Sequence, residues 1–336
     1  MKNRDRGYAI LMIIFAFVMQ GCIHDYPHPV RGPFPGKGED PTTVGAIINV
    51  SFNLSWESML HHVNFYSGTR ARTDKPYRFV IEVVKEGVVV SHDVINVSSE
   101  EFSLGKLKHK LSKPLEASLY KITAWYDIQD NQGEYSFLTE ELGGVTLINH
   151  STTDAEILQC GYASDIIDLT PYAEDLMEET VSKELEMQHP GARFEIVATD
   201  VQQFITNQKA ALNQGDQFTV HISFGSEVGD SFNLYAQSLN HNGETLNLSG
   251  RMRLPFAEYD ELKIAEGFIF SDAEQDVEAS LSVKNSALVT VAGTGNFTFP
   301  VKRGYITTVK GDFLTNGIGG MFNIDHIWEG EIVIEI

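Results

Sequence analysis

The sequence has few cysteines: Cys22 and Cys160 are the two in 336 residues. A disulfide framework of the kind that holds small secreted domains together needs more thiols than this. The fold must therefore be stabilised by apolar cores, and hydrophobic residues make up 42% of the chain.

Basic residues are also scarce. The chain has 25 Lys and Arg against 46 Asp and Glu, which gives a formal net charge of −21. A chain of this charge is repelled by nucleic-acid phosphates, and no basic patch with interleaved aromatic residues is visible. We therefore expect no nucleic acid among its partners.

The sequence also lacks the motifs of common catalytic and metal sites. It has no Gly-x-Ser-x-Gly elbow and no His-Glu-x-x-His pattern. Gly293–Asn296 lacks the Lys-Ser/Thr ending of a phosphate loop and is interpreted as a hairpin turn. The segment from Asp127 to Gly133 lacks the closing Glu of a calcium loop and is interpreted as a surface turn. We predict a protein that is not an enzyme and that holds no metal and no cofactor.

Single reactive side chains have simpler explanations. Cys160 lacks a thiol-enzyme signature around it, so we interpret it as a small buried residue. Carboxylate pairs adjacent in sequence indicate solvated faces, and the histidines lack the spacing of metal ligands. The residues concerned are Glu100-Glu101, Glu140-Glu141, Glu178-Glu179, His24, His28 and His61-His62.

The first 22 residues have the pattern of an export signal. Three basic residues precede an apolar run from Tyr8 to Met19, which is too short to span a bilayer. Gly21-Cys22 follows, and this pair resembles the lipobox of bacterial lipoproteins, in the tolerant form seen in Bacteroidota. We expect residues 1–21 to be a lipoprotein signal peptide and Cys22 to carry acyl chains that hold the mature chain on a membrane. The alternative is a leader whose Cys22 remains an ordinary thiol.

Residues 22–45 are rich in proline, glycine and charge. Proline removes backbone donors and glycine raises the entropy of the unfolded chain, so this stretch is predicted to be an extended spacer. It would lift the folded part of the protein away from the lipid surface.

Alternating apolar residues then predict strands through the rest of the chain. Ile48 to Leu54 alternates, and two runs around a Glu86-Gly87 turn predict a β-hairpin. Pro190-Gly191 interrupts the pattern near the middle, which suggests one domain over 46–190 and a second over 191–336. We predict a mainly β fold of two tandem antiparallel β-sandwiches, with one short helix from Val201 in the second. For residues 175–187 we expect mixed helix and strand.

Two segments of the chain suggest how it could assemble with partners. The polar loop from Ser67 to Lys75 contains Arg70 and Arg72 and is either an ordinary solvated loop or an accessible target for an Arg-specific protease. Cleavage there could release the first strand and leave a vacant sheet edge that accepts a partner strand. The C-terminal run Ile332–Ile336 is either the last strand of the second sandwich or a donor strand.

Several passages together resemble the fimbrillin-like surface lipoproteins of Bacteroidales, including relatives that anchor or cap fimbriae. These passages are Gly21–Pro27, Arg78–Val83, Tyr120–Asp127, Ala192–Ile196, Thr199–Ile205 and Lys302–Gly311. The resemblance implies transthyretin-like sandwich domains, lipid anchoring at the outer membrane and the cell surface, and assembly with fimbrial or other surface subunits by strand donation. A retained first strand would favour an anchor, tip or accessory role, whereas cleavage at Arg70 or Arg72 would favour a stalk subunit.

Three readings of function follow, and the third is a surface hydrolase, which would need three carboxylates or a Ser-His pair to meet in one cleft. The first is a non-enzymatic fimbrial or adhesion component on the cell surface. The alternative is a glycan-binding surface lipoprotein of a nutrient-uptake system, in which Trp56, Trp125 and Trp328 would form a sugar platform. Each indole lies in or beside a strand pattern, and burial in the core would argue against a platform.

Overall fold

The computed structural model describes residues 47–55, 75–129, 133–148, 159–173, 179–208, 217–240, 245–254, 261–315, 328–329 and 331–335. The predicted signal peptide, Cys22, the spacer and the loop with Arg70 and Arg72 lie outside these residues. Strands dominate, and the α-helices of the described part are α3 (Ser99–Phe102) and α4 (Val201–Gln208). In these ranges no helix has the length and apolar character to span a bilayer. The expected mainly β fold, with a short helix in the second half, is confirmed.

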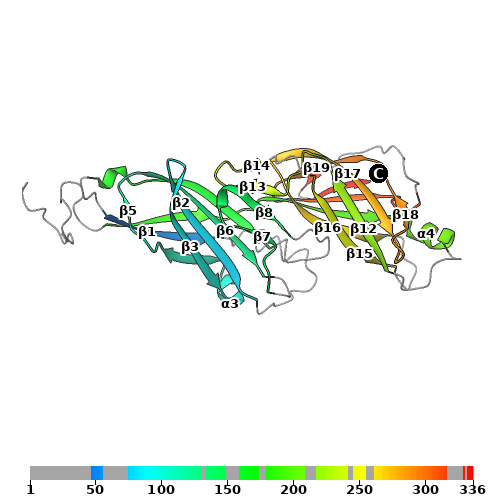
Figure 1. The fold of residues 1–336 in the computed structure, drawn as a ribbon, viewed down its shortest axis with the longest axis horizontal. Coiled ribbons are helices and arrows are strands. Elements are labelled where there is room, and N and C mark those ends of the chain that lie inside the picture. Colours follow the sequence, from blue (N-terminus) through cyan, green and yellow to red (C-terminus); the bar gives the residue numbers. More distant parts are fainter. Residues whose placement is uncertain are drawn as a thin grey trace, which may run out of the picture.

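Two β-sandwiches lie end to end in an elongated molecule (Figure 1). The N-terminal sandwich is formed by β1 (Ile47–Ser55), β2 (Tyr77–Lys85), β3 (Val88–Val97), β4 (Lys106–Lys110), β5 (Leu115–Glu116), β6 (Leu119–Ile128), β9 (Gly161–Asp168) and β10 (Glu179–Glu186). One of its sheets has the order β3-β2-β6-β9 and the other the order β10-β1-β4, with β5 also paired to β1.

Side-chain alternation explains why these strands form a sandwich. In β2 the alternate residues Tyr77, Phe79, Ile81 and Val83 all lie in the core between the two sheets. The turn from β2 to β3 places Glu86 at φ 51° and Gly87 at φ 82°. Two successive positive φ values are what a tight type I′ hairpin requires. The predicted hairpin is therefore confirmed.

The C-terminal sandwich follows the same plan. Its strands are β11 (Gly191–Ala198), β12 (Gln217–Phe224), β15 (Asn247–Arg253), β16 (Leu262–Phe270), β17 (Glu274–Lys284), β18 (Thr290–Gly293), β19 (Phe297–Lys302), β20 (Ile306–Gly311), β21 (Trp328–Glu329) and β22 (Glu331–Glu335). One sheet has the order β16-β11-β20-β22-β21. The other has the order β15-β12-β17-β18, and β19 also pairs with β17.

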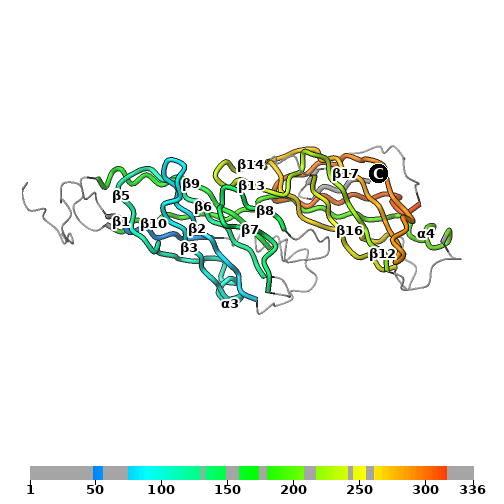
Figure 2. Tube along the Cα trace, in the orientation of Figure 1, coloured from blue at the N-terminus to red at the C-terminus, as the bar shows by residue number. Residues whose placement is uncertain are grey.

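A small sheet joins the two sandwiches. It has the order β14-β13-β8-β7, from β7 (Phe137–Leu138), β8 (Val145–Leu147), β13 (Ser231–Asn233) and β14 (Ser238–Asn240). Strands from the two halves of the sequence thus lie side by side at the middle of the molecule, as the Cα trace also shows (Figure 2). The domain boundary predicted at 190/191 falls in the short connection between β10 and β11, and it stays a prediction.

The first strand of each sandwich has a parallel partner. β1 pairs in parallel with β10, and β11 pairs in parallel with β20. β22 in turn runs parallel to β20, so the C-terminal run belongs to the ladder of the second sandwich, the first of the two alternatives considered. The other strand pairs named in the described ranges are antiparallel.

Within the stretch 175–187, where mixed helix and strand were expected, residues 179–186 form strand β10 through pairing with β1, and residues 175–178 lie outside the described residues. Two other local expectations were wrong. Gly293–Asn296 is not a hairpin turn: β18 and β19 both run antiparallel along β17, and this segment interrupts them. Asp127 is not part of a surface turn, because it lies within β6, one residue before the strand ends, with 1% of its surface exposed.

Candidate functional site

Strand β1 lies inside its sheet, with a neighbour on each side. Ile48 to Ser55 pair in parallel with Glu179 to Glu186 of β10. On the other side Ser51 to Ser55 pair with β4, and Ile47 and Ile48 pair with β5. Further backbone bonds run from Leu111 N to Val50 O (2.9 Å) and from Met187 N to Ser55 O (2.7 Å).

The inward face of β1 is a large part of the N-terminal core. Ile48, Val50, Phe52 and Leu54 are all 0% exposed. Burial of side chains of this size stabilises a fold by roughly 1.5–3 kcal/mol each, so the four together contribute about 6–12 kcal/mol. The sandwich therefore depends on β1, although the strand is joined to it through the loop predicted to be open to proteases.

The position of β1 corrects the expectation about its release. Loss of an edge strand would leave one unpaired neighbour, but β1 separates β10 from β4. Its removal would open a slot with unpaired backbone on both sides and an apolar floor. Such a slot fits an incoming strand with apolar residues at alternate positions.

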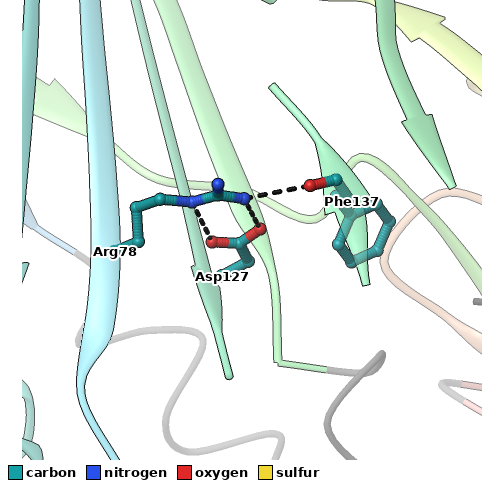
Figure 3. Close-up of polar contacts among 3 residues, drawn as sticks. All are labelled: Arg78, Asp127 and Phe137. Atoms are coloured by element: carbon teal, nitrogen blue, oxygen red, sulfur yellow. Dashed lines mark hydrogen bonds and ion pairs between the residues drawn. The ribbon is translucent and has the colours of Figure 1, made fainter. Parts of the chain in front are cut away.

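A buried ion pair ties β2 to β6 (Figure 3). Arg78 Nε donates to Asp127 Oδ1 at 2.9 Å and Nη2 to Oδ2 at 2.5 Å. Nη2 also donates to the Phe137 carbonyl of β7 at 3.0 Å, and the guanidinium lies 3.7 Å from the ring centroid of Tyr135. Burial raises the pKa of Asp127, and the bonds from Arg78 oppose that shift. The pair therefore fixes the joining sheet to the N-terminal sandwich.

A second buried carboxylate, Glu82 of β2, links the two sandwiches. Its Oε2 accepts hydrogen bonds from the Tyr235 hydroxyl at 2.6 Å and from Leu142 N at 3.0 Å, and its Oε1 lies 2.8 Å from His92 Nδ1. Tyr235 belongs to the turn between β13 and β14, and its carbonyl accepts from Lys121 Nζ. Burial raises the pKa of the Tyr235 hydroxyl well above its ordinary value, and the Glu82 carboxylate adds to the shift. The phenol is thus a fixed donor across the junction.

Arg303 forms the matching contact from the C-terminal side. Its Nη1 donates to the Tyr162 hydroxyl of β9 at 2.8 Å. Its other nitrogens donate to the carbonyls of Ser271 and Gln237. The guanidinium carbon also lies 5.0 Å from the ring centroid of Phe232. One cation therefore connects a strand of the first sandwich with two loops of the second.

Aromatic rings fill the space between these polar contacts. Trp125 of β6 meets Phe137 at 5.0 Å between ring centroids, and Phe137 meets Phe270 of β16 at 5.8 Å. Tyr162 meets Phe232 edge-on at 5.4 Å. All five residues belong to one core cluster that continues into the C-terminal sandwich. This junction core packs the two sandwiches against each other through a continuous apolar interface, which opposes a hinge motion between them.

The Tyr235 to Glu82 contact can be tested by removing a single oxygen. Tyr235→Phe should lower the free energy of unfolding by about 1.5–3 kcal/mol, the range for a hydrogen bond to a charged group. Urea denaturation followed by circular dichroism would measure it. The matched control is Tyr120→Phe, which removes a neutral bond to the Glu116 carbonyl inside the N-terminal sandwich. Its expected loss is about 0.5–1.5 kcal/mol, and equal losses would contradict a special role for the junction.

The residues singled out from the sequence fall in different places. Cys22, Arg70 and Arg72 lie outside the described residues, so lipidation and cleavage stay predictions. Cys160 is 0% exposed, and burial raises the pKa of its thiol well above the ordinary value, as expected for a structural cysteine. Trp125 is also 0% exposed and cannot stack on a sugar. Trp56 lies outside the described residues, and of Trp328 only the backbone is described.

Sequence reasoning missed Glu82, Asp127 and Arg303. For Glu82, the sequence did contain a signal of a buried charge: a charged residue inside an otherwise apolar strand, as in Phe79-Val-Ile-Glu82. Such a charge stays in a buried strand only when partners satisfy it. Across the parts of the chain that are described, no group of three or more His, Cys, Asp or Glu side chains could hold a metal ion.

Comparisons with known proteins assign the chain to a family. No curated protein matches the sequence. Among solved structures, the chain is similar to the fimbrial anchor protein Mfa2 from Porphyromonas gingivalis, with 13% identity, a TM-score of 0.38, and coverage of 76% of this chain and 82% of that one. It is similar to a fimbrial assembly protein from Parabacteroides distasonis, with 10% identity, a TM-score of 0.40, and coverage of 80% and 92%. The profile of a family of unknown function, DUF6562, matches residues 41–336, and the chain therefore belongs to the DUF6562 family.

Proposed function

We propose that the chain is a lipid-anchored structural or adhesion protein of the bacterial cell surface, which serves as an anchor, tip or accessory subunit of a fimbrium. Cys22 would supply attachment to the outer membrane, and residues 22–45 would supply the reach. The two sandwiches would then carry the contacts to partner subunits. No chemical step is needed for this role.

The observation that carries the proposal is the integration of β1. Four fully buried side chains and pairing on both sides hold this strand in the N-terminal sandwich. A subunit that keeps its first strand has no open slot in that sandwich, so it can receive no donor strand there. That property suits the end or the base of an assembly, where the chain of donated strands stops.

The junction supports a mechanical role as well. Force applied to one sandwich passes to the other through the shared sheet and through the contacts of Glu82 and Arg303. Two sandwiches packed in this way would transmit load between a membrane anchor and a distal partner without an internal hinge. A flexible linker between the two sandwiches would have absorbed that load as extension.

The anchor can be tested on protein made in a Bacteroidales host. The mature chain isolated from membranes should begin at an acylated Cys22 and should be uncut at Arg70 and Arg72, as read by mass spectrometry. A Cys22→Ser chain should leave the membrane fraction, because several acyl chains at about 0.8 kcal/mol per buried methylene supply the attachment. Cys160→Ser is the matched control and should fractionate as the parent chain does.

Two results would contradict parts of the proposal. If the Cys22→Ser chain still sediments with membranes, the lipid anchor is wrong. If the mature chain is cut at Arg70 or Arg72 and has lost residues 47–55, the chain is a stalk subunit and not an anchor, tip or accessory subunit.

A further inference from the structure

A row of three lysines runs along the outer face of strand β4. Lys106, Lys108 and Lys110 are all exposed. The residues between them point the other way: Leu107 packs against the N-terminal core, and His109 Nε2 lies 2.8 Å from Asp93 Oδ2. Alternate residues of a strand lie about 6.6–6.8 Å apart along it, so the three lysine side chains leave β4 at even intervals.

This row differs from four other lysines of the described residues, which have ion pairs. Lys85, Lys183, Lys263 and Lys310 each lie within 3.4 Å of a carboxylate oxygen. In the part of the chain that the structure describes, no such ion pair involves the β4 lysines. Their neighbours across the sheet are the short side chains Ser55, Asn53 and Ser51 of β1, followed by Glu186 and Glu184 of β10. Three adjacent positive charges therefore face solvent in a chain whose formal net charge is −21.

The second sandwich presents a row of acids with the same repeat. Glu274, Asp276 and Glu278 alternate along β17 and are all exposed, while Val277 between them is buried. Across the sheet they stand opposite Lys302, Pro300 and Thr298 of β19. Glu278 also accepts a hydrogen bond from the Asn296 amide, which fixes one end of the row.

We propose that these two rows bind each other between two copies of this chain, the lysines of one copy against the acids of the next. The match is geometric, because both rows lie on β-strands and share one repeat, so each lysine can meet one carboxylate without distortion of either strand. Packed sheet faces lie about 10 Å apart, a gap that an extended lysine and a glutamate or aspartate span together.

The surroundings of the rows define how the copies meet. Glu184 and Glu186 on the far side of β1 repel a misplaced acid row, which keeps the partner over β4. The rows belong to different sandwiches, so the contact can either close as a two-fold pair, in which each copy supplies both rows, or repeat head-to-tail. Exposed ion pairs are individually weak and screened by salt. The association should thus be strongest at low ionic strength and high local concentration, as between neighbouring molecules on one surface.

Zero-length carbodiimide cross-linking tests this contact, because the reagent joins a lysine to a carboxylate only when the two touch. Purified full-length chain is mixed in unlabelled and ¹⁵N-labelled form at low salt, cross-linked and analysed by mass spectrometry. We expect mixed-isotope peptides that join the β4 lysines to the β17 acids, and their loss in about 0.5 M salt, where the Debye length falls to a few ångströms.

The decisive experiment exchanges the charges of the lysine row and the acid row. The variant K106E/K108E/K110E has no amines on β4, so its association is read by sedimentation velocity at low salt, and it should fall at least about tenfold because like charges then face each other. Mixing it with E274K/D276K/E278K should restore the association and give mixed-isotope peptides that join the new β4 glutamates to the new β17 lysines. The control K183E/K263E/K310E makes the same change in net charge at lysines that already have partners, and it should keep the β4 to β17 peptides. Circular dichroism would confirm that each variant is folded.

The alternative role of edge lysines is to prevent aggregation, and the variants separate the two. Glutamates on β4 would still protect the edge, so that role predicts no specific cross-links and no rescue by exchange. Absence of mixed peptides in the parent chain, undiminished association of K106E/K108E/K110E, or failure of the exchanged pair to associate would overturn the proposal. Retention of the parent chain on a heparin column, lost in K106E/K108E/K110E and without cross-links between copies, would overturn it in favour of a polyanionic polymer. None of these outcomes depends on whether Cys22 is acylated.

Discussion

Replacement of Phe52 by alanine should lower the free energy of unfolding by about 3–5 kcal/mol, the range for truncation of a buried phenylalanine. Phe52 is 0% exposed in the middle of β1, where the sheets formed around β2 and β1 meet. The cavity cannot close easily, because β10 and β4 hold β1 from both sides. Urea denaturation monitored by circular dichroism would measure the change.

The neighbouring residue provides the control for this prediction. Asn53 lies on the outer face of the same strand, and its Nδ2 donates to Ser182 Oγ at 3.0 Å. Asn53→Ala should cost under about 1 kcal/mol, because that bond is exposed and exchanges with water. Comparable losses in the two variants would mean that β1 does not fill the core, and the case for a retained first strand would fail with it.

Alternation in the sequence was enough to predict β1, β2, β12 and the tight turn at Glu86-Gly87. A period of two specifies which side chains face a core, and a Gly-containing pair between two alternating runs indicates a two-residue hairpin turn. The same pattern cannot specify neighbours. The pairing of β1 with β10 joins residues about 130 positions apart, and no local feature of either strand encodes it. The slot between β10 and β4 was therefore mistaken for an edge.

Apart from the charge of Glu82 inside an apolar strand, the junction could not be predicted from the sequence, for a related reason. The sequence shows only that Trp125 and Phe137 are apolar. Either side chain could have pointed into the core of a sandwich instead of into the junction between the two sandwiches. Asp127 follows an apolar strand and precedes Asp130-Asn131, so it was interpreted as part of a turn. Its burial becomes visible only when Arg78 is placed beside it by the antiparallel pairing of β2 and β6.

That ion pair gives the second large effect. Asp127→Ala should lower the free energy of unfolding by about 3–5 kcal/mol, because it leaves the Arg78 guanidinium largely buried without its counter-charge. Arg78→Met combined with Asp127→Leu removes both charges and should recover most of the loss, since apolar side chains of similar size often replace a buried pair without penalty. Urea denaturation of the three chains at pH 7 would show this. A double variant as unstable as Asp127→Ala would mean that packing, not an orphaned charge, causes the loss.

The pH dependence of the same chains has a definite sign. Burial raises the pKa of Asp127 above its value in the unfolded chain, although Arg78 opposes the shift. The folded state then binds the proton more tightly than the unfolded state, so this group's contribution to stability is fully present below the unfolded pKa near 4 and declines as the pH rises through the raised pKa. The double variant Arg78→Met/Asp127→Leu lacks the Asp127 carboxyl group. The stability of this variant relative to the parent chain should therefore increase as the pH rises from about 3 to 7. A relative stability that falls over this range would mean that Arg78 dominates and holds the carboxylate ionised.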